Sequence, residues 1–377
     1  MSLTIREIKT DKEKKAFIGL TRDLYKNDPN FIQPLDIERL ESLDPKKNPF
    51  FDHARAGLFV AEQDGRLVGR ISASYDDFAQ EKWGPDLGYF GCFEAKSKDV
   101  ADALLNAAKD WLKDQGAKTM QGPWSLSPKE EVGLLIDGFD TPPCFLMPHG
   151  KPEYEGWLTG FGLEKAHDVY AYQLDLTKPW PDKTRRIMDL AKKNAKLTLR
   201  ELDTKRYDAE IALIVDIVTD AWSENWGFTP FTPDEGAHLA SSLKFLLKPH
   251  RTVFAEYEGE AIGFMITLPD LNADIHDFNG KLFPTNIFKF LSRRILSKKE
   301  GRMRVPLMGV RKTMQAGKIG GLAALMMIDY STVQVKSHGA YWGELGWILD
   351  TNEGMNNILV QIGCERYKTY RIFEKAI

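Results

Sequence analysis

Two successive stretches of the chain carry the same order of strand and helix patterns. Each begins with a strand and a helix, continues with a β-hairpin and a further strand, and ends by alternating helices with strands. Alternating apolar residues mark the strands, and apolar residues three or four apart mark the helices. Because the second pass starts about 190 residues after the first, the pattern predicts an internal duplication. The expected strands are 4–8, 57–62, 67–74, 88–94, 118–122 and 169–176, then 196–202, 252–257, 261–268, 305–310, 343–349 and 367–373; the expected helices are 11–25, 99–115 and 154–160, then 207–224, 320–337 and 352–362.

The duplication predicts an α/β (α+β) protein of two tandem domains. The length of 377 residues also favours two domains over one. We expect an N-terminal domain at 1–176 and a C-terminal domain at 196–377. Between them, residues 177–195 contain Pro179, Pro181 and many basic residues, which is typical of a linker with a short helix.

The cysteines and the apolar runs exclude several classes of protein. Cys92, Cys144 and Cys364 are far apart and form no CxxC or Cys/His cluster, so we expect no disulfide scaffold and no metal site. The first 20 residues carry eight charges, which is unlike a signal peptide. Since no long uninterrupted apolar run occurs, we expect no membrane span and a cytoplasmic location.

The net charge of −3 conceals a strongly basic segment. Residues 281–318 contain eleven lysines and arginines and one acid, Glu300, which gives a local charge of +10. Such asymmetry predicts a partner that carries phosphates or another negative charge. Nucleic acid is the weaker option, because the segment contains no recognised nucleic-acid-binding module.

A candidate phosphate-binding loop lies inside this basic segment. The expected strand that ends at Val310 is followed by Gly317, Gly320 and a long helix. Glycines let a pyrophosphate approach the backbone, and the helix N-terminus offers free N–H groups. Arg311, Lys312 and Lys318 would neutralise the phosphates. The alternative is a glycine-rich surface turn with solvated lysines.

This loop resembles the acyl-CoA loop of the GNAT family of N-acyltransferases, whose pattern is Gln/Arg-x-x-Gly-x-Gly/Ala. Gln315 and Gly320 match its first and last positions, and Lys318 replaces its middle glycine. Asn352 matches an asparagine that the family often places beside the pantetheine arm. The resemblance implies two GNAT domains, each with a mixed central sheet. It also implies that acyl-CoA binds at Met308, Gly309, Val310, Arg311, Gln315, Ala316, Gly317, Lys318, Ile319, Gly320 and Asn352.

The two halves differ in this loop and in one further feature. After the strand 91–94 of the first half the loop has no glycine, so the first half looks like a degenerate GNAT domain that shapes the substrate site. The tyrosine that many family members use as a general acid would fall near Leu359 or Val360 and is absent from both positions.

Several longer phrases resemble a group of bacterial tandem-GNAT proteins over nearly the whole chain. That group is similar to the bacterial ceramide synthases, which transfer a fatty acyl group from acyl-CoA to the amine of a sphingoid base. The phrases are GPWSLS at 122–127, GLLIDGFDTPP at 133–143, MPH at 147–149, AWSENWG at 221–227, ELGW at 344–347 and YKTYR at 367–371.

Two residues are candidates for the proton transfer that N-acylation requires. Glu344 lies between apolar neighbours on an expected strand, where a raised pKa would suit a general base; the alternative is a solvent-facing strand residue. His149 lies on a loop rich in proline and glycine, as does Asp137, a candidate for the substrate site. The alternatives are a helix-capping His149 and a turn at Asp137-Gly138.

Three further residues are expected to bind substrate: Asn225, Trp226 and Trp347. Asn225 and Trp226 lie on a loop between helices, where they could line a pocket for the acyl chain or the amine. Core packing is the alternative for Trp226, because it follows Trp222 at helical spacing.

A basic amphipathic insert, 281–304, interrupts the second domain. Between Phe283 and Leu296, helical spacing places most apolar residues on one side, with basic residues flanking them. This pattern favours a helix that lies on a membrane surface, or a lid over a long acyl chain. A core-packed insert with a solvated basic face is the alternative.

The sequence therefore predicts an acyl-CoA-dependent N-acyltransferase that acts on a sphingoid-type amine at the inner membrane surface. Its co-substrate would be acetyl-CoA or a long-chain acyl-CoA. Three alternatives stay open: acetylation of a small polar amine, a ligase that takes an aminoacyl group from transfer RNA, and a non-catalytic protein that binds CoA or lipid.

Overall fold

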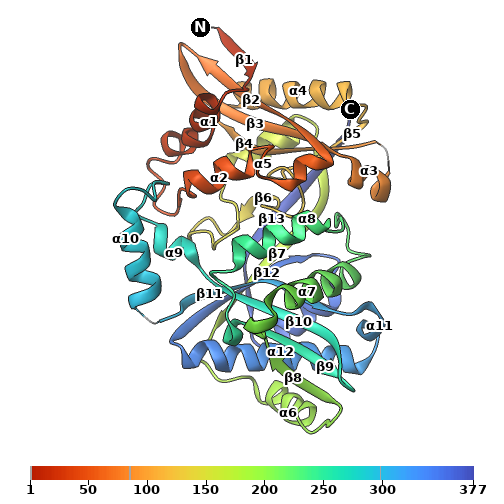
Figure 1. The fold of residues 1–377 in the computed structure, drawn as a ribbon. Coiled ribbons are helices and arrows are strands. Elements are labelled where there is room, and N and C mark those ends of the chain that lie inside the picture. Colours follow the sequence, from red (N-terminus) through yellow and green to blue (C-terminus); the bar gives the residue numbers. More distant parts are fainter. Residues whose placement is uncertain (1, 85, 298) are drawn as a thin grey trace. The chain divides into compact units, whose positions relative to one another are not determined.

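A computed structural model describes residues 2–84, 86–297 and 299–377. The chain forms two compact units, each described separately here (Figure 1). Unit 1 contains residues 1–169, 272–291 and 368–377, and unit 2 contains 170–271 and 292–367. The segments 272–291 and 368–377, which come late in the sequence, thus belong to unit 1.

Unit 1 is built on a sheet in the order β1-β2-β3-β4-β5-β13, in which β4 and β5 pair in parallel. Helix α4 packs on β2 and β3 over a core that includes Ile71, Leu104 and Phe373. The strands whose residues lie wholly or partly in unit 1 are β1 (Leu3–Glu7), β2 (Ala54–Gln63), β3 (Arg66–Asp76), β4 (Leu87–Ala95), β5 (Thr119–Gly122), β6 (Leu134–Asp137), β7 (Glu164–Asp175) and β13 (Glu365–Ala376); the helices are α1 (Asp11–Leu24), α2 (Asp36–Ser42), α3 (Asp77–Trp83), α4 (Lys98–Asp114), α5 (Glu153–Gly160), α9 (Leu271–Ile275) and α10 (Asn286–Leu291).

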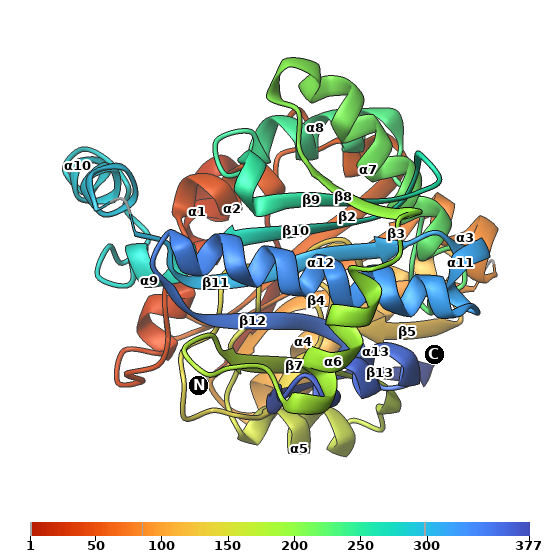
Figure 2. The same cartoon turned by 90° about the horizontal axis from the view of Figure 1, so that it is seen from below.

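Unit 2 repeats this plan with the sheet order β8-β9-β10-β11-β12-β7, in which β11 and β12 pair in parallel. Figure 2 shows α12 running along this sheet, where it packs on β9, β10 and β12. Helix α7 packs on β10 and β11. The strands are β8 (Leu197–Glu201), β9 (Thr252–Tyr257), β10 (Glu260–Pro269), β11 (Gly301–Val310) and β12 (Ala340–Leu349); the helices are α6 (Asp182–Ala191), α7 (Tyr207–Ala221), α8 (Pro233–Leu243), α11 (Lys312–Gln315), α12 (Lys318–Ser337) and α13 (Glu353–Gln361).

Helices α7 and α12 cover opposite faces of the unit 2 sheet. Because neighbouring residues of β10 point to opposite faces, two successive residues show which helix covers each face. At Gly263, an added Cβ would contact Met327 of α12. One residue later, Phe264 lies near Gly309, whose own added Cβ would contact Ala221 of α7. Both faces of this sheet are therefore covered; β10 is largely buried, and most residues of β11 are half-buried.

The last strand of each sequence repeat lies partly in the unit that the other repeat forms. Residues 368–376 of β13 belong to unit 1, where they pair with β5 and β6. Residues 170–175 of β7 belong to unit 2, in the sheet position next to β12. The linker segment expected at 177–195 contains α6, which packs against α12.

Candidate functional site

The parallel strands of unit 2 separate part-way along their length. Strands β11 and β12 are paired from Gly301 and Ala340 as far as Val305 and Leu345. The next residue, Pro306, has no N–H to donate. It also lies in a β-bulge, where β11 has one residue more than the facing part of β10. Because bulges bend the strand that carries them, β11 diverges from β12 here and leaves an opening.

This opening, the unit 2 slot, is lined without any Asp, Glu, Lys, Arg or His. The Trp222 indole donates a hydrogen bond of 3.1 Å to the Met308 carbonyl oxygen, and its ring centroid lies 6.3 Å from that of Trp347. Such an uncharged lining suits an apolar or amide-containing chain. The space in the slot is about 600 Å³ with the adjoining open solvent included, and the slot is lined by Trp222, Asn225, Val305, Pro306, Met308, Leu345, Gly346, Trp347, Ile348, Leu349, Asn352, Met355 and Leu359.

The slot brings together four residues that the sequence analysis selects: Asn225, Met308, Trp347 and Asn352. Asn352 is the N-cap of α13, and its side-chain oxygen accepts a 3.1 Å hydrogen bond from the Met355 N–H. This cap fixes Asn352 at the edge of the slot. Trp226 is not part of the slot lining.

The loop after β11 presents the N-terminus of α12. Gly317 is the N-cap, and no side chain caps the helix. A side chain at Gly320 would collide with the Met314 carbonyl oxygen, so the tight path of the loop requires glycine there. Lys318 is exposed and has no ion-pair partner among the described residues. The first N–H groups of a 20-residue helix and one free lysine fit an anion such as a diphosphate.

The other polar residues of this loop are engaged with protein groups. Arg311 forms an ion pair of 2.6 Å with Asp216, and the Lys312 ammonium lies 2.7 Å from Glu224. Gln315 donates from its side-chain amide to the Val310 and Ala221 carbonyl oxygens. Arg311 and Lys312, both expected to neutralise phosphates, thus each have an acidic partner on or just after α7 in ion pairs that are open to solvent.

Glu344 lies on β12 at the centre of a buried polar cluster. Its side chain is 0% exposed, and its Oε1 lies 3.0 Å from Nε of Arg304. Tyr367 donates a hydrogen bond to its Oε2. The solvent-facing alternative for Glu344 is therefore wrong. The purely apolar surroundings are also corrected, because the Arg304 guanidinium and the Tyr367 hydroxyl contact the carboxylate.

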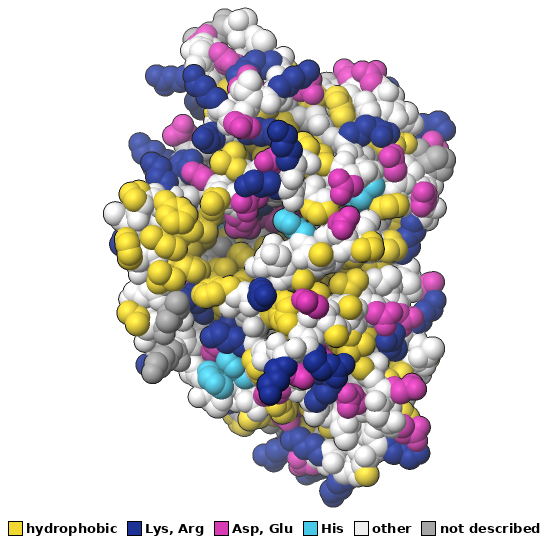
Figure 3. Space-filling model, viewed as in Figure 1, with side chains coloured by type: hydrophobic (Ala, Val, Ile, Leu, Met, Phe, Trp, Pro, Cys, Tyr) yellow, Lys and Arg dark blue, Asp and Glu magenta, His cyan; other side chains and the backbone are white. Residues whose placement is uncertain are grey.

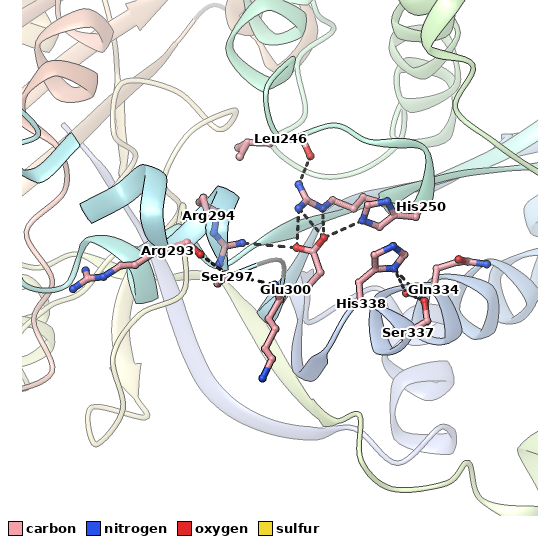
Figure 4. Close-up of polar contacts among 11 residues, drawn as sticks. Leu246, His250, Arg293, Arg294, Ser297, Glu300, Gln334, Ser337 and His338 are labelled. Atoms are coloured by element: carbon pink, nitrogen blue, oxygen red, sulfur yellow. Dashed lines mark hydrogen bonds and ion pairs between the residues drawn. The ribbon is translucent and has the colours of Figure 1, made fainter. Parts of the chain in front are cut away.

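The basic segment is likewise tied to acidic partners. Figure 4 shows Glu300 and the residues around it. The buried Glu300 accepts hydrogen bonds of 2.7 Å from Arg251 and of 2.9 Å from His250, and it lies 3.8 Å from Arg294. Burial acts to raise the pKa of Glu300, but the Arg251 charge and these hydrogen bonds hold it below its ordinary value. Ion pairs of Arg302 and Arg304 with Asp270 and Glu344 reduce the free positive charge further.

In unit 1, His149 and Asp137 have different surroundings. The His149 side chain is 3% exposed, and its Nε2 lies 2.8 Å from Oδ2 of Asp28. Asp137 is exposed at the end of β6, and Gly138 follows with a φ of 90°. This geometry agrees with the turn alternative for Asp137-Gly138. Asp28 could not be found from the sequence, because it lies 121 residues from His149 without any local motif.

A second opening, the unit 1 cavity, contains about 1180 Å³ of space with the adjoining open solvent included, and His149 is part of its wall. Unlike the unit 2 slot it is lined by several charged side chains. The charged residues of the lining are Glu38, Arg39, Arg70, Glu94, Glu130 and Glu131.

Metal sites and membrane-spanning helices are both absent from the described residues. Within residues 2–84, 86–297 and 299–377, no group of three or more His, Cys, Asp or Glu residues is arranged to hold a metal ion. In the same residues, no helix combines the length and apolar character that crossing a membrane requires.

Comparison with known proteins identifies the family. A model of the acetyltransferase (GNAT) family matches residues 22–122. A bacterial ceramide synthase of Caulobacter vibrioides (strain NA1000 / CB15N) is 42% identical over 378 residues, which span this chain and 98% of that protein. The chain belongs to the tandem GNAT acyltransferase family. Protein YghO of Escherichia coli (strain K12) is also similar to this GNAT chain, with 40% identity over 375 residues, 99% of this chain and 95% of that one.

Solved structures confirm the fold of this GNAT chain. A tandem GNAT protein from the clavulanic acid biosynthesis pathway has a TM-score of 0.57 at 12% identity and covers 100% of this chain and 98% of its own. A GCN5-related N-acetyltransferase from Sphaerobacter thermophilus has a TM-score of 0.55 at 13% identity, with 99% and 95% covered. The predicted α/β fold of two tandem GNAT domains is confirmed.

The family model matches the half that the sequence analysis treats as degenerate. Residues 22–122 include β2, β3, β4, α4 and β5 of unit 1. This half therefore keeps a recognisable GNAT framework, although its loop between β4 and α4 contains no glycine.

Proposed function

We propose that this protein is an acyl-CoA-dependent N-acyltransferase whose unit 2 holds acyl-CoA. The observation that carries the proposal is the uncharged slot between β11 and β12, formed where the strands diverge after Val305. The same strand β11 leads to the uncapped N-terminus of α12. A thioester with its amide-containing arm suits the slot, and a diphosphate suits the helix terminus.

Within this site, the chain's residues divide into two sets. The N–H groups at the start of α12, together with Lys318, would hold the phosphates. Met308, Trp347 and Asn352 would line the arm that carries the thioester. Arg311 and Lys312 keep the loop attached to α7 through their ion pairs instead of binding phosphate.

The reaction is a direct attack of the amine nitrogen on the thioester carbonyl carbon. The N–C bond forms, the C–S bond breaks, and CoA leaves as a thiolate that takes up a proton. The amine must also lose a proton. We assign this proton transfer to Tyr367 and Glu344. Tyr367 is partly exposed, and its hydroxyl donates a hydrogen bond to the buried Glu344. The Arg304 guanidinium lies 3.0 Å from the Glu344 carboxylate and holds it in place beside Tyr367.

For the substrates, we propose a fatty acyl-CoA and a sphingoid-type amine. The 42% identity with a protein named bacterial ceramide synthase supports this choice. The apolar lining of the slot agrees with a substrate that carries a hydrocarbon chain. Acetylation of a small polar amine, transfer of an aminoacyl group and CoA binding without catalysis are alternative outcomes of the experiment below.

A local apolar surface around α10 supports contact with an anionic membrane. Phe283 is 61% exposed and Phe288 is 71% exposed. Figure 3 shows hydrophobic side chains gathered over the position that α10 has in Figure 1. Lys281 and Lys289 flank these aromatic residues, as in helices that lie on anionic lipid surfaces. We place the protein in the cytoplasm, at the inner face of the membrane.

The test is a thiol-release assay with the purified full chain. Palmitoyl-CoA and acetyl-CoA are compared with a long-chain 2-amino-1,3-diol and with a small polar amine as acceptors, and the amide product is verified by mass spectrometry. We expect thiol release and amide formation with palmitoyl-CoA and the long-chain amine. A preference for acetyl-CoA with the small amine would remove the lipid substrate, and CoA binding without any release would remove the enzyme function.

A further inference from the structure

A second space in unit 2, the inner pocket, adjoins the unit 2 slot. Strands β7, β10, β11 and β12 and helix α12 supply its lining, and it contains about 340 Å³ with the adjoining open solvent included. Val305 and Leu345, the last paired residues of β11 and β12, line both the inner pocket and the slot. The two spaces therefore meet where the strands begin to separate.

The wall of the inner pocket suits a hydrocarbon chain. Its described lining contains no Lys, Arg, His or Asp, and the carboxylate of Glu344 is engaged with Arg304 and Tyr367. Most of the other lining side chains are apolar. Met265 and Met303 are among them, and the flexible side chain of methionine adjusts to the shape of a ligand.

The hydroxyl group of Thr267 is an exception in this wall. Thr267 is 3% exposed, and its Oγ1 is buried without a hydrogen-bond partner among the described residues. On β10, Thr267 faces the bulge formed by Val305 and Pro306, so it lies beside the point where the slot and the inner pocket meet. Because a buried hydroxyl without a partner is unfavourable, Thr267 has capacity for a ligand group that donates or accepts a hydrogen bond.

The position of Thr267 indicates where such a group lies on an acyl chain. The thioester assigned to the slot would place the start of the chain beside Val305 and Leu345. Neighbouring strands are about 4.8 Å apart, so Thr267 on β10 is one strand spacing from Val305 on β11. The first carbons after the thioester carbonyl are therefore within reach of the Thr267 hydroxyl.

We propose that unit 2 binds a hydroxylated fatty acyl-CoA, with the hydroxyl group on carbon 2 or carbon 3 of the acyl chain. The chain enters the inner pocket, and Thr267 forms a hydrogen bond with its hydroxyl group. This inference rests on the proposed acyl-CoA site and adds the chemical class of the acyl group. Binding of the thioester can be measured without an acceptor amine and therefore without catalysis.

The experiment compares the binding of four compounds to the full-length protein by calorimetry. They are CoA, dodecanoyl-CoA, 2-hydroxydodecanoyl-CoA and 3-hydroxydodecanoyl-CoA. We expect the wild-type protein to bind at least one hydroxylated thioester about tenfold more tightly than dodecanoyl-CoA, because a site built around a hydroxyl discriminates against a ligand that lacks it.

Two threonine variants test the role of the hydroxyl. Thr267→Val keeps the branched shape and removes the hydroxyl, so the tenfold preference should disappear while dodecanoyl-CoA binds as before. Thr252→Val is the matched control, because Thr252 is also buried with an unpartnered Oγ1 but lies on β9 outside the inner-pocket lining. It should keep the preference. Thermal unfolding verifies that both variants fold.

A third variant tests whether the chain enters the inner pocket. Gly343 lines the pocket, and an added Cβ would contact only the Leu176 side chain, at 3.9 Å. Gly343→Leu therefore fills the pocket without disturbing the strand. It should weaken the binding of all three acyl thioesters at least tenfold and leave the affinity for CoA unchanged.

The outcomes separate a failed pocket from a failed function. Equal binding of the three acyl thioesters to the wild type, or an unchanged preference in Thr267→Val, overturns the hydroxyl assignment and leaves the acyltransferase proposal standing. Wild-type acyl-chain binding in Gly343→Leu overturns the inner pocket in the same way. If the preference and its loss are found but no amide forms with any amine, the pocket assignment stands and the acyltransferase proposal fails. If neither CoA nor any thioester binds, both proposals fail.

Discussion

Strands β4 and β11 occupy the same place in the two units and carry the same irregularity, yet the openings beside them differ in chemistry. Each strand contains a β-bulge. In β4, Cys92 and Phe93 face one residue of β3, and in β11, Val305 and Pro306 face one residue of β10. Beside β11 the lining is uncharged, whereas beside β4 it contains four carboxylates and two arginines. The duplicated fold thus keeps the position of the opening and changes what it can bind.

The segments that follow these strands differ as well. In unit 1, the N–H of Trp124 donates to the Phe90 carbonyl oxygen at 2.7 Å, so a backbone bond continues the contact beyond the paired residues of β4 and β5. In unit 2, the corresponding strands separate, and a longer loop with Gly317 and Gly320 leads to α12. This difference supports the proposal that unit 2, and not unit 1, holds acyl-CoA.

The largest expected effect concerns the ion pairs of the two units. Glu344→Gln leaves the buried Arg304 guanidinium without its counter-charge, which costs about 3–5 kcal/mol of unfolding free energy. Glu131→Gln removes the partner of Arg39 in unit 1, where both side chains retain some solvent exposure, and costs about 1 kcal/mol. Urea denaturation of both variants measures the difference. Equal losses would contradict the assignment of a deeply buried pair to unit 2.

The next effect separates catalysis from stability. Tyr367→Phe keeps the Arg304–Glu344 pair but removes the hydroxyl that donates to Glu344, so kcat should fall about 10- to 100-fold. Tyr172→Phe is the matched control, because it removes a hydroxyl that donates to Asn356 in the same unit and should leave kcat unchanged. Steady-state rates at saturating acyl-CoA provide the measurement. A normal rate for Tyr367→Phe would remove this tyrosine from the proton path.

A smaller effect concerns the pH dependence of stability in unit 1. Burial raises the pKa of Glu130 from 4.5 to about 8; the Arg39 charge opposes this, while Glu131 and Glu38 add to it. Between these pH values the folded protein keeps a proton that the unfolded chain releases, so rising pH lowers the free energy of unfolding until about pH 8. Glu130→Gln has no proton to lose. Its melting temperature should therefore exceed that of the wild type increasingly from pH 5 to pH 8, and a constant difference would contradict the raised pKa.

The smallest effect concerns the surface around α10. Phe288→Ser removes a large exposed apolar side chain and should reduce binding to vesicles that contain anionic lipid by about tenfold. Phe245→Ser, at another exposed phenylalanine, should have no effect on the binding. Co-sedimentation with phosphatidylglycerol vesicles measures the difference. Equal binding of both variants would remove α10 from the membrane contact.

The elements that local patterns define are predicted well from the sequence. The hairpins expected from the strands 57–62 and 67–74 and from 252–257 and 261–268 both form, because turn residues and alternating apolar residues agree there. The assignment of β13 to unit 1 was not predictable, since the final strands of both repeats have similar patterns and either could complete either sheet.

The site was predictable only in part. Nearby motifs in the sequence indicate a binding role for Met308, Trp347 and Asn352. All three line the slot. Arg304 faces Glu344 only because of strand register, 40 positions apart in sequence. Glu38 and Glu130 carry no motif and come together through the fold of unit 1, so a search for local patterns could not find them.

The central claim, that unit 2 holds acyl-CoA, is tested most directly by placing a carboxylate at each of the two helix N-termini. Gly317 has room for a side chain and an extended backbone, so Gly317→Asp caps α12 favourably while it repels phosphates. Ser97→Asp makes the same change at the N-cap of α4 in unit 1. In calorimetric titrations with CoA, we predict one site per chain for the wild type and for Ser97→Asp, and about 100-fold weaker binding for Gly317→Asp with no loss of thermal stability. Wild-type affinity in Gly317→Asp together with lost binding in Ser97→Asp would contradict the account.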